Sequence, residues 1–307
     1  PKYNLGVSGG GHGSMTGRMM VELEILFQKE LPQLLMVYGD TNSTLAAALV
    51  ARKLNIPIAH VEAGLRNFDM SIPEDVNRIL TDRVSDLLFC PTDLAITNLE
   101  NEGFSRMPCK IIKTGDLMND AVKYYASFSE EKSNVVKRLS LEKNEYVICT
   151  IHRAHNTEPP GIFETFKALN KIGEKEKVVF PIHPRTKMAL EKHDISLNPN
   201  IVIIEPQGYF DMVELLKNCN CVITDSGGLQ KEAYALGKKS LQLMDYTPWE
   251  ELVSYGFSLV TDIKYDTILE KWQTLKGIYP DYNIQLYGGG NSNKEIICSL
   301  LKFLASN

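Results

Sequence analysis

CVITDSGGLQKEAYAL, residues 221–236, is the stretch that decides the fold. Its first four residues, Cys221 to Thr224, form an apolar run that predicts a buried β-strand. The turn Ser226-Gly227-Gly228 follows, and the rest of the stretch is typical of a helix. Strand, turn and helix in this order make one unit of an α/β fold.

The same unit recurs along the chain. Further apolar runs predict strands at residues 34–38, 56–61, 87–90, 147–151, 177–182 and 201–204, and helices are expected at 17–30, 44–54 and 293–304. This alternation predicts an α/β protein with parallel sheets covered on both faces. The polar residues that directly follow the strands include Asp40, Glu62, His152, His183 and Asp225. Ligands of open α/β sheets bind at these carboxyl ends.

A polar segment, residues 127–144, separates two sets of strands and is rich in Ser, Glu, Lys and Asn. Such a composition is typical of a domain boundary. The sequence therefore predicts two doubly wound, Rossmann-like domains, residues 1–140 and 141–290.

The composition excludes several classes of function. With 307 residues, 44% hydrophobic and 23% charged, the chain is long enough for two domains with separate cores. A net charge of -5 offers no basic face for nucleic acid or an anionic membrane. Neither an apolar stretch of about 18 residues nor a signal-peptide pattern at PKYNLG is present, so a cytoplasmic protein is expected.

The six cysteines lie mostly in apolar runs, which is typical of buried thiols in a reducing compartment. Only one residue separates Cys219 from Cys221, and no second Cys or His pair follows at zinc-binding spacing. No metal site is expected.

The Ser226-Gly227-Gly228 turn is the strongest local signal for a ligand. Glycines let a phosphate approach the backbone, and the N-terminus of the next helix offers unpaired N–H groups and a partial positive charge. Glu232, farther along that helix, can accept hydrogen bonds from ribose hydroxyls. The alternative is an ordinary tight turn in which Asp225 caps the helix. We favour the phosphate site.

A second set of residues carries carboxylates. GDT at 39–41, HVEAGLR at 60–66 and PEDVNR at 73–78 place Asp40, Glu62 and Glu74 just past strand ends or on the next helix. Convergence of the three would raise the pKa of at least one by mutual repulsion. The alternative for Glu74 and Arg78, four residues apart on a helix, is a surface salt bridge. That pair taken alone favours the salt bridge.

A third set combines IHRAHN at 151–156 with PIHPRT at 181–186. Here His152, His183 and Arg185 at strand ends suit an anionic ligand, although a lone histidine at a strand end is as often structural. Metal ligation by the histidines is supported by no spacing.

Together these segments resemble the non-hydrolysing UDP-N-acetylglucosamine 2-epimerases. The matching pieces, in the family's order, are GDTNST at 39–44, HVEAGLR at 60–66, PEDVNRILTD at 73–82, IHRAHN at 151–156, HPRT at 183–186 and DSGGLQKEA at 225–233. Their number and order make chance agreement implausible.

The resemblance implies a two-domain fold like that of GT-B glycosyltransferases, with a UDP-sugar between the halves and the final helix, 291–307, packed on the first domain. It implies a homodimer and needs no metal or nicotinamide cofactor. A base removes the C2 proton, UDP leaves C1 to give a glycal, and UDP adds back after reprotonation on the other face.

The resemblance also assigns roles to residues. The acid/base candidates are Asp40, Glu62 and Glu74, and the groups that support the leaving diphosphate are Arg78 and His152. The residues implied in substrate or UDP binding are His183, Arg185, Ser226, Gly227, Gly228 and Glu232.

Three departures from the family pattern stand out. The family usually has Glu in place of His155, and an Arg-x-x-Thr-Glu pattern in place of Met244 to Pro248. Family chains also begin with a strand, a Gly-x-Arg-Pro loop and a second unit, about sixty residues that correspond to two βα units. We therefore expect an incomplete first domain.

Four functions follow as hypotheses. Conversion of UDP-N-acetylglucosamine to UDP-N-acetylmannosamine for a surface polysaccharide is the default. A subgroup that resembles this chain around His152, Lys231 and Trp249 includes epimerases of UDP-2,3-diacetamido-glucuronic acid. The others are an inactive or truncated nucleotide-sugar-binding relative and a GT-B glycosyltransferase, which has little need for C2 proton chemistry.

Overall fold

The computed structural model describes residues 1–306, which divide into two compact units. The first unit consists of Pro1–Leu117 and the segment from Leu286 onward, and the second is Met118–Gln285. Both are α/β units built around a parallel sheet.

The division falls after Leu117, not near residue 140 as the sequence predicts. The polar segment 127–144 contains two short helices, α6 (Ser129–Lys132) and α7 (Val135–Arg138). Val135 is fully buried in a cluster with Leu215 and Leu216 of the second unit. A few apolar residues thus anchor a segment whose composition is that of a linker.

The first unit has a four-stranded parallel sheet in the order β1-β2-β3-β4. Its strands are β1 (Leu35–Tyr38), β2 (Ile58–Val61), β3 (Leu87–Cys90) and β4 (Lys110–Lys113). Its helices are α1 (His12–Glu30), α2 (Asn42–Lys53), α3 (Pro73–Val84), α4 (Asp93–Asn101), the short η1 (Phe104–Arg106) and α15 (Ser292–Ser306).

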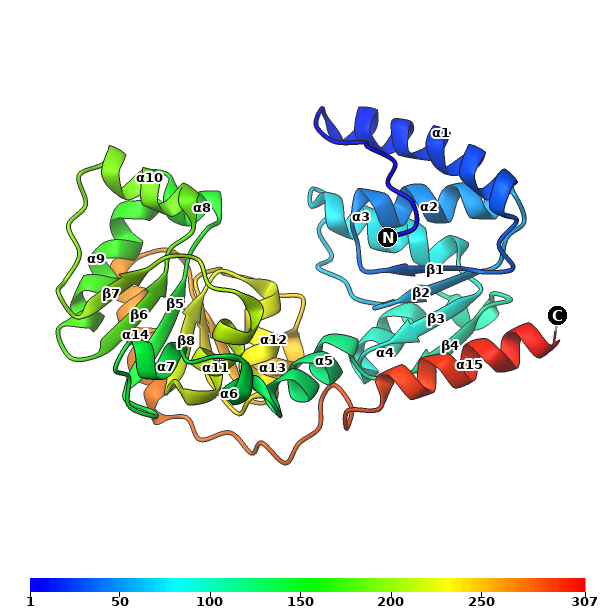
Figure 1. Ribbon diagram of the computed structural model, residues 1–307. Coiled ribbons are helices and arrows are strands. Elements are labelled where there is room, and N and C mark those ends of the chain that lie inside the picture. Colours follow the sequence, from blue (N-terminus) through cyan, green and yellow to red (C-terminus); the bar gives the residue numbers. More distant parts are fainter. Residues whose placement is uncertain (307) are drawn as a thin grey trace. The chain divides into compact units, whose positions relative to one another are not determined.

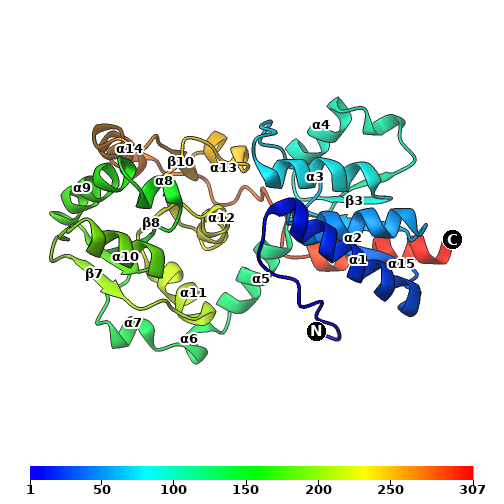
Figure 2. The same cartoon turned by 90° about the horizontal axis from the view of Figure 1, so that it is seen from above.

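Helices cover both faces of this sheet. On one face α2 packs on β1 and β2 and α1 lies along α2, burying Phe27, Val37 and Ile58 (Figures 1 and 2). On the other face α15 places Ile296 against β2 and β3. The final helix therefore belongs to the first unit.

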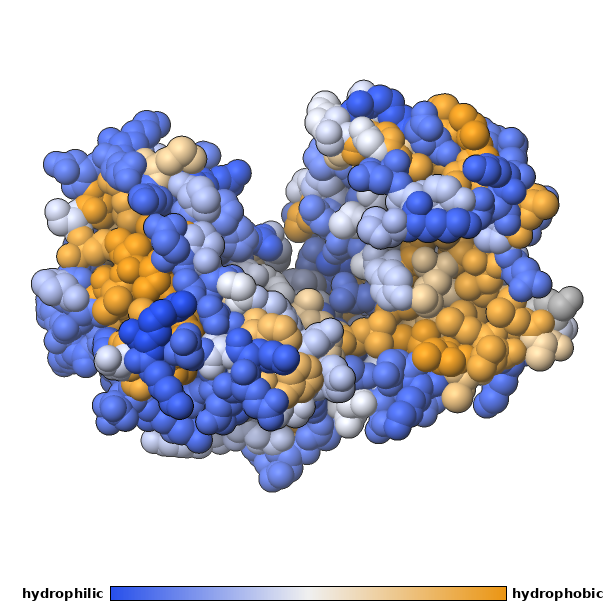
Figure 3. Space-filling model, in the orientation of Figure 1, coloured by the Kyte–Doolittle hydropathy of each residue, from blue (hydrophilic) through white to orange (hydrophobic). Residues whose placement is uncertain are grey.

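Part of the first unit's apolar surface stays exposed. The outward side of α15 carries Ile297 and Leu301, which are 55% and 62% exposed, and β1, at the edge of the sheet, exposes Met36 and Tyr38. Figure 3 shows hydrophobic residues gathered over the part of the first unit where α15 lies.

The second unit has a six-stranded parallel sheet in the order β10-β9-β8-β5-β6-β7. The strands are β5 (Tyr146–Thr150), β6 (Lys177–Pro181), β7 (Ile201–Ile204), β8 (Cys221–Thr224), β9 (Lys239–Gln242) and β10 (Ser258–Val260). The chain builds outward from β5 in one direction and then from β8 in the other. This is the strand order of a Rossmann fold, and its switch point lies between β5 and β8.

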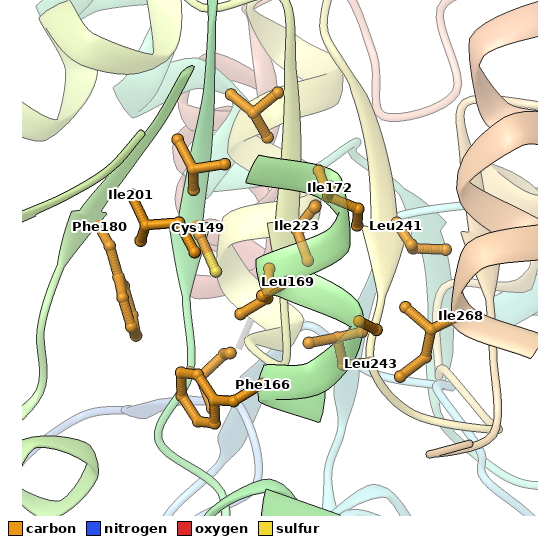
Figure 4. Close-up of a cluster of buried hydrophobic side chains, with 14 of the residues drawn as sticks. Cys149, Phe166, Leu169, Ile172, Phe180, Ile201, Ile223, Leu241, Leu243 and Ile268 are labelled. Atoms are coloured by element: carbon orange, nitrogen blue, oxygen red, sulfur yellow. The ribbon is translucent and has the colours of Figure 1, made fainter. Parts of the chain in front are cut away.

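Several larger helices belong to the second unit. They are α5 (Leu117–Ala126), α9 (Gly161–Gly173), α10 (Pro184–Lys192), α11 (Tyr209–Asn218), α12 (Gly227–Ala235) and α14 (Tyr265–Gly277), with shorter α8 (Ala154–Thr157) and α13 (Glu250–Ser254). On one face Phe166 and Leu169 of α9 and Ile268 of α14 pack on the strands (Figure 4). On the other, α7, α11 and α12 bury a second cluster.

Every strand that the sequence predicts is present, and β4, β9 and β10 are additional. β4 (KIIK) has two apolar residues between lysines and lies at a sheet edge. In β9 and β10 the buried Ser240 and Ser258 hydrogen-bond to each other at 3.0 Å. Because polar side chains in these two strands hydrogen-bond across the sheet, the strands contain no continuous apolar run that would predict them from the sequence.

Val135→Ala tests the position of the division. Removing two buried methyl groups should lower the free energy of unfolding by about 2 kcal/mol. The exposed neighbour Lys137 provides the control, since Lys137→Ala should change it by less than about 0.5 kcal/mol. Urea unfolding followed by circular dichroism measures both, and equal effects would show that 127–144 is a loose linker.

Candidate functional site

Two neighbouring turns of the first unit bring Asp40 and Glu62 to the same edge of its sheet. Gly39 follows β1 at a φ of 62°, and its N–H donates to the Val61 carbonyl at 3.0 Å. A Cβ on Gly39 would lie 3.8 Å from Glu62 Oε1. The Glu62 carboxylate therefore lies beside the turn that carries Asp40.

Glu62 has a strained backbone. Its φ of 74° is in the left-handed region, which a residue with a Cβ seldom adopts. The N–H groups of Glu62 and Ala63 both donate to the Phe89 carbonyl, each at 3.1 Å. Strain of about 1–3 kcal/mol persists only where the surroundings enforce it, and it concentrates at functional sites. The turn holds the Glu62 side chain at the carboxyl edge of β2.

Arg78 lies on α3 and is 6% exposed. Its guanidinium forms an ion pair with Asp40, and its Nη1 lies 3.3 Å from Asp75 Oδ1. The predicted surface salt bridge between Glu74 and Arg78 is therefore wrong, because Arg78 points toward buried partners. Glu74 is exposed on the first turn of α3 and forms no ion pair within residues 1–306.

Sequence reasoning missed two residues at this site. Asn77 Nδ2 donates to the Asp40 carbonyl at 2.8 Å and to Asn42 Oδ1 at 3.2 Å. The buried Asp75 accepts backbone hydrogen bonds from Asn67 and Asp69. Both follow Glu74 within the PEDVNR motif, so the motif held the signal, but only the fold assigns contacts to them.

A second polar cluster lies at the switch point of the second unit's sheet, where Asp225 directly follows β8 and β5 leads to His152. The buried Asp225 carboxylate accepts from His152 Nδ1 at 2.8 Å, from the N–H groups of His152 and Arg153, and from Asn156 Nδ2 at 3.1 Å. Burial acts to raise the pKa of Asp225, but the His152 and backbone hydrogen bonds prevail and lower it.

His183 and Arg185 lie in the same cluster. The His183 side chain caps α10 by accepting from the Arg185 N–H at 3.2 Å. Arg185 Nη1 is 3.4 Å from the His152 carbonyl, and the His152 and His183 rings are 5.8 Å apart. The structure thus brings together the three residues that the sequence selected around the IHRAHN and HPRT motifs.

Ser226, not Asp225, caps α12, because its Oγ accepts from the Leu229 N–H at 3.4 Å. The alternative with Asp225 as the cap is wrong, since that carboxylate binds the loop after β5. A Cβ on Gly227 or Gly228 would meet no protein atom closer than 3.7 Å. Neither glycine is needed for packing within its unit, so both leave the start of α12 open to a ligand.

Glu232 lies on α12 behind this turn. Burial raises its pKa, and the Lys231 charge opposes the shift. Burial, with the Glu232 charge nearby, also raises the pKa of Tyr209 to about 12. The Glu232 charge therefore acts on the Tyr209 hydroxyl, and Tyr209 was not selected from the sequence.

The departures from the family pattern have local explanations in the structure. His155 Nε2 is 3.1 Å from the Leu243 carbonyl and ties α8 to the end of β9. Within 244–248, Thr247 hydrogen-bonds to Gln230 of α12, and the Tyr246 hydroxyl is 3.4 Å from Arg153 Nη1. This segment thus supports the cluster around α12 with a different set of side chains.

Residues 1–306 contain no group of three or more His, Cys, Asp or Glu side chains arranged to hold a metal ion. No helix among them is both long and apolar enough to cross a bilayer.

Two parallel sheets with polar clusters at their carboxyl ends define an α/β protein with two Rossmann-like domains. The family model for UDP-N-acetylglucosamine 2-epimerase matches residues 1–301. The chain belongs to this family.

Similar proteins include a UDP-2,3-diacetamido-2,3-dideoxy-D-glucuronate 2-epimerase from Pseudomonas aeruginosa, 44% identical over 98% of this chain and 84% of that protein. The UDP-GlcNAc 2-epimerase of Methanocaldococcus jannaschii, crystallised with UDP-GlcNAc and UDP, has a TM-score of 0.87 at 36% identity, covering 99% of this chain and 84% of that one. The Neisseria meningitidis enzyme bound to UDP-GlcNAc has a TM-score of 0.84 at 30% identity, covering 95% and 82%.

The chain spans 84% of the P. aeruginosa protein and 83% of a UDP-N-acetylglucosamine 2-epimerase from M. jannaschii.

Asp225→Asn tests the carboxylate at the switch point. The substitution replaces one carboxylate oxygen, an acceptor, with an NH₂ group, a donor that would face other N–H groups. The free energy of unfolding should therefore fall by about 3 kcal/mol at pH 7. The lowered native pKa means that the carboxylate stabilises fully above the ordinary Asp pKa of about 3.9 and less as pH falls through the native value. The difference between wild type and variant should therefore shrink below about pH 3.9.

Urea unfolding at several pH values measures this difference. Asp266→Asn, at an exposed position on α14, is the control and should change stability by less than about 0.5 kcal/mol at every pH. A D225N deficit that does not vary with pH would contradict the assignment of the shift to this carboxylate.

Proposed function

We propose that the chain epimerises C2 of a UDP-linked 2-acetamido sugar, converting UDP-N-acetylglucosamine to UDP-N-acetylmannosamine without net hydrolysis. The observation that carries this proposal is the pair of carboxylates, Asp40 and Glu62, on neighbouring turns at one sheet edge. Inversion at carbon requires a proton to leave one face and return to the other, which two acid/base groups can perform. The membership in the epimerase family supports the same reaction.

The reaction balances without an external oxidant or reductant. A carboxylate takes the C2 proton, the C–H electron pair forms the C1–C2 double bond, and the C1–O bond breaks with its electrons passing to the UDP oxygen. A proton then reaches the opposite face of C2, and the UDP oxygen re-forms its bond to C1. The departing diphosphate needs electrostatic stabilisation, and the base needs a fixed position.

In the first unit, Asp40, Glu62 and Glu74 are the proposed acid/base groups. Arg78 is buried and forms an ion pair with Asp40, which favours a role in orienting that carboxylate. The resemblance also implies that Arg78 supports the leaving diphosphate. Glu74 stands one turn before Arg78 on α3 and is exposed, so its carboxylate is accessible to a substrate.

In the second unit, the start of α12 is the proposed diphosphate site. Its open Gly227 and Gly228 backbone, with the partial positive charge of a helix N-terminus, suits two phosphate groups. We propose that His152, His183 and Arg185 bind or stabilise the anionic substrate from the switch point, and Glu232 accepts hydrogen bonds from the ribose.

A second candidate substrate is UDP-2,3-diacetamido-glucuronic acid. The P. aeruginosa relative, which carries that substrate in its name, is 44% identical, compared with 37% for a named UDP-N-acetylglucosamine 2-epimerase from M. jannaschii. Both sugars undergo the same C2 chemistry, so the proposed roles of Asp40 and Glu62 are unchanged. The family resemblance alone supports two further proposals, a homodimer and a place in surface polysaccharide synthesis.

Incubation in deuterated water tests the reaction. Wild-type protein should place deuterium at C2 of its sugar, and Asp40→Asn and Glu62→Gln should each slow this exchange by about 100-fold or more. Glu100→Gln, an exposed carboxylate on α4, is the control and should exchange at the wild-type rate. Mass spectrometry and NMR of the recovered sugars measure the label, and separate runs with the two sugars identify the preferred substrate.

The same experiment distinguishes the alternatives. UDP binding without deuterium incorporation on either sugar would favour a nucleotide-sugar-binding protein. Release of UDP in proportion to an added acceptor sugar, again without label at C2, would favour a glycosyltransferase.

Gly228→Ala and Gly227→Ala test the diphosphate site. A Cβ at either position meets no protein atom closely. The free energy of unfolding of each variant should therefore equal that of wild type or exceed it by up to about 1 kcal/mol. UDP affinity measured by calorimetry should nevertheless fall by about tenfold or more, which is about 1.4 kcal/mol. Gly277→Ala, at the end of α14 where a Cβ also meets nothing, should leave UDP affinity unchanged. Unchanged UDP affinity in all three variants would show that the diphosphate does not bind at the start of α12.

A further inference from the structure

His60 is fully buried on β2 and makes a hydrogen bond with each ring nitrogen. Its Nε2 lies 2.8 Å from the Gly39 carbonyl, and its Nδ1 lies 2.6 Å from Asp82 Oδ1. Gly39 directly precedes Asp40, and Asp82 belongs to the last turn of α3. The ring therefore joins the turn after β1 to α3.

The two ring nitrogens of His60 have different partners. A backbone carbonyl only accepts, so Nε2 carries a hydrogen and donates it to Gly39. Asp82 pairs with Nδ1 and also accepts from the Gly64 N–H at 3.1 Å and from Arg66 Nη1 at 2.8 Å. Burial acts to raise the pKa of Asp82, but the charges and hydrogen bonds of His60 and Arg66 lower it.

Asp82 also spans the strained turn at Glu62. One carboxylate oxygen accepts from His60, two residues before Glu62, and the other from the backbone of Gly64, two residues after it. Arg66 pairs with Asp82 and with Glu102. The carboxylate thus fixes both ends of the segment that holds Glu62 at positive φ.

We propose that His60 is a positioning residue that locks the Gly39-Asp40 turn against the Glu62 turn, so that the two carboxylates keep the separation that proton transfer requires. The proposal rests on the proposed function of Asp40 and Glu62. His60 itself is fully buried, so it acts through its hydrogen-bond partners. Its effect passes through the Gly39 carbonyl.

A simpler alternative is that His60 only neutralises Asp82 and fills the core. In that case its bond to Gly39 has no consequence for the reaction. The two readings differ in which ring nitrogen matters, because Nδ1 serves Asp82 whereas Nε2 serves the Asp40 turn.

His60→Asn and His60→Gln separate these roles. The amide nitrogen of Asn lies where Nδ1 lies and can keep the bond to Asp82, whereas that of Gln lies where Nε2 lies and can keep the bond to Gly39. H60Q leaves Asp82 with one donor fewer, so it should be the less stable variant in urea unfolding. H60N frees the Asp40 turn, so it should be the less active variant.

We expect kcat for C2 deuterium exchange to fall by about 100-fold in H60N and by no more than about tenfold in H60Q. KM for the sugar and UDP affinity should change less than about threefold in both, because neither variant alters the substrate-binding groups. Opposite orders of stability and activity are the signature of positioning. If kcat follows stability, with H60Q the slower enzyme, the inference is overturned.

Backbone hydrogen exchange of the peptide that covers residues 39–44 gives a readout independent of catalysis. It should be faster in H60N than in H60Q, and equal rates would also overturn the inference. If wild-type protein fails to incorporate deuterium at C2, the proposed function fails, and the exchange of this peptide still decides whether His60 holds the turn.

Discussion

A buried carboxylate that must be satisfied by hydrogen-bond donors is the constraint on which both polar clusters depend. In the first unit Asp82 pairs with His60 on β2 and accepts from Gly64 and Arg66, which follow that strand. An unpaired buried charge would cost several kcal/mol, so these donors are held in place. These bonds hold the residues on both sides of Glu62 and so fix the conformation of the loop that carries it.

The second unit uses the same device at its topological switch point. Asp225 accepts from the backbone of His152 and Arg153 and from the side chain of Asn156, so the loop after β5 is drawn toward the end of β8. Buried ion pairs contribute little net stability compared with apolar packing, but they select one arrangement of the chain. In both units a fully buried aspartate holds the turns that carry the proposed site residues.

This arrangement explains how strain is maintained at Glu62. Its left-handed backbone is unfavourable for a residue with a Cβ, yet hydrogen bonds to Phe89 on one side and to Asp82 through Gly64 on the other leave it no relaxed conformation. The apolar strands β2 and β3, buried on both faces, supply the rigid support for these bonds. Packing thus stabilises a geometry that local propensity opposes.

The sequence by itself determined the α/β class, the strands with continuous apolar runs, and the residues at their ends, because burial on both faces of a parallel sheet leaves a direct pattern in the chain. It also selected Asp40, Glu62, His152 and Ser226, since polar residues at strand ends must lie at one sheet edge. Only the tertiary structure decided that Arg78 binds Asp40 rather than Glu74, that Ser226 rather than Asp225 caps α12, and that 127–144 packs on the second unit. Contacts between residues far apart in the chain have no signature in local spacing. A side chain's partner depends on which way the fold turns it.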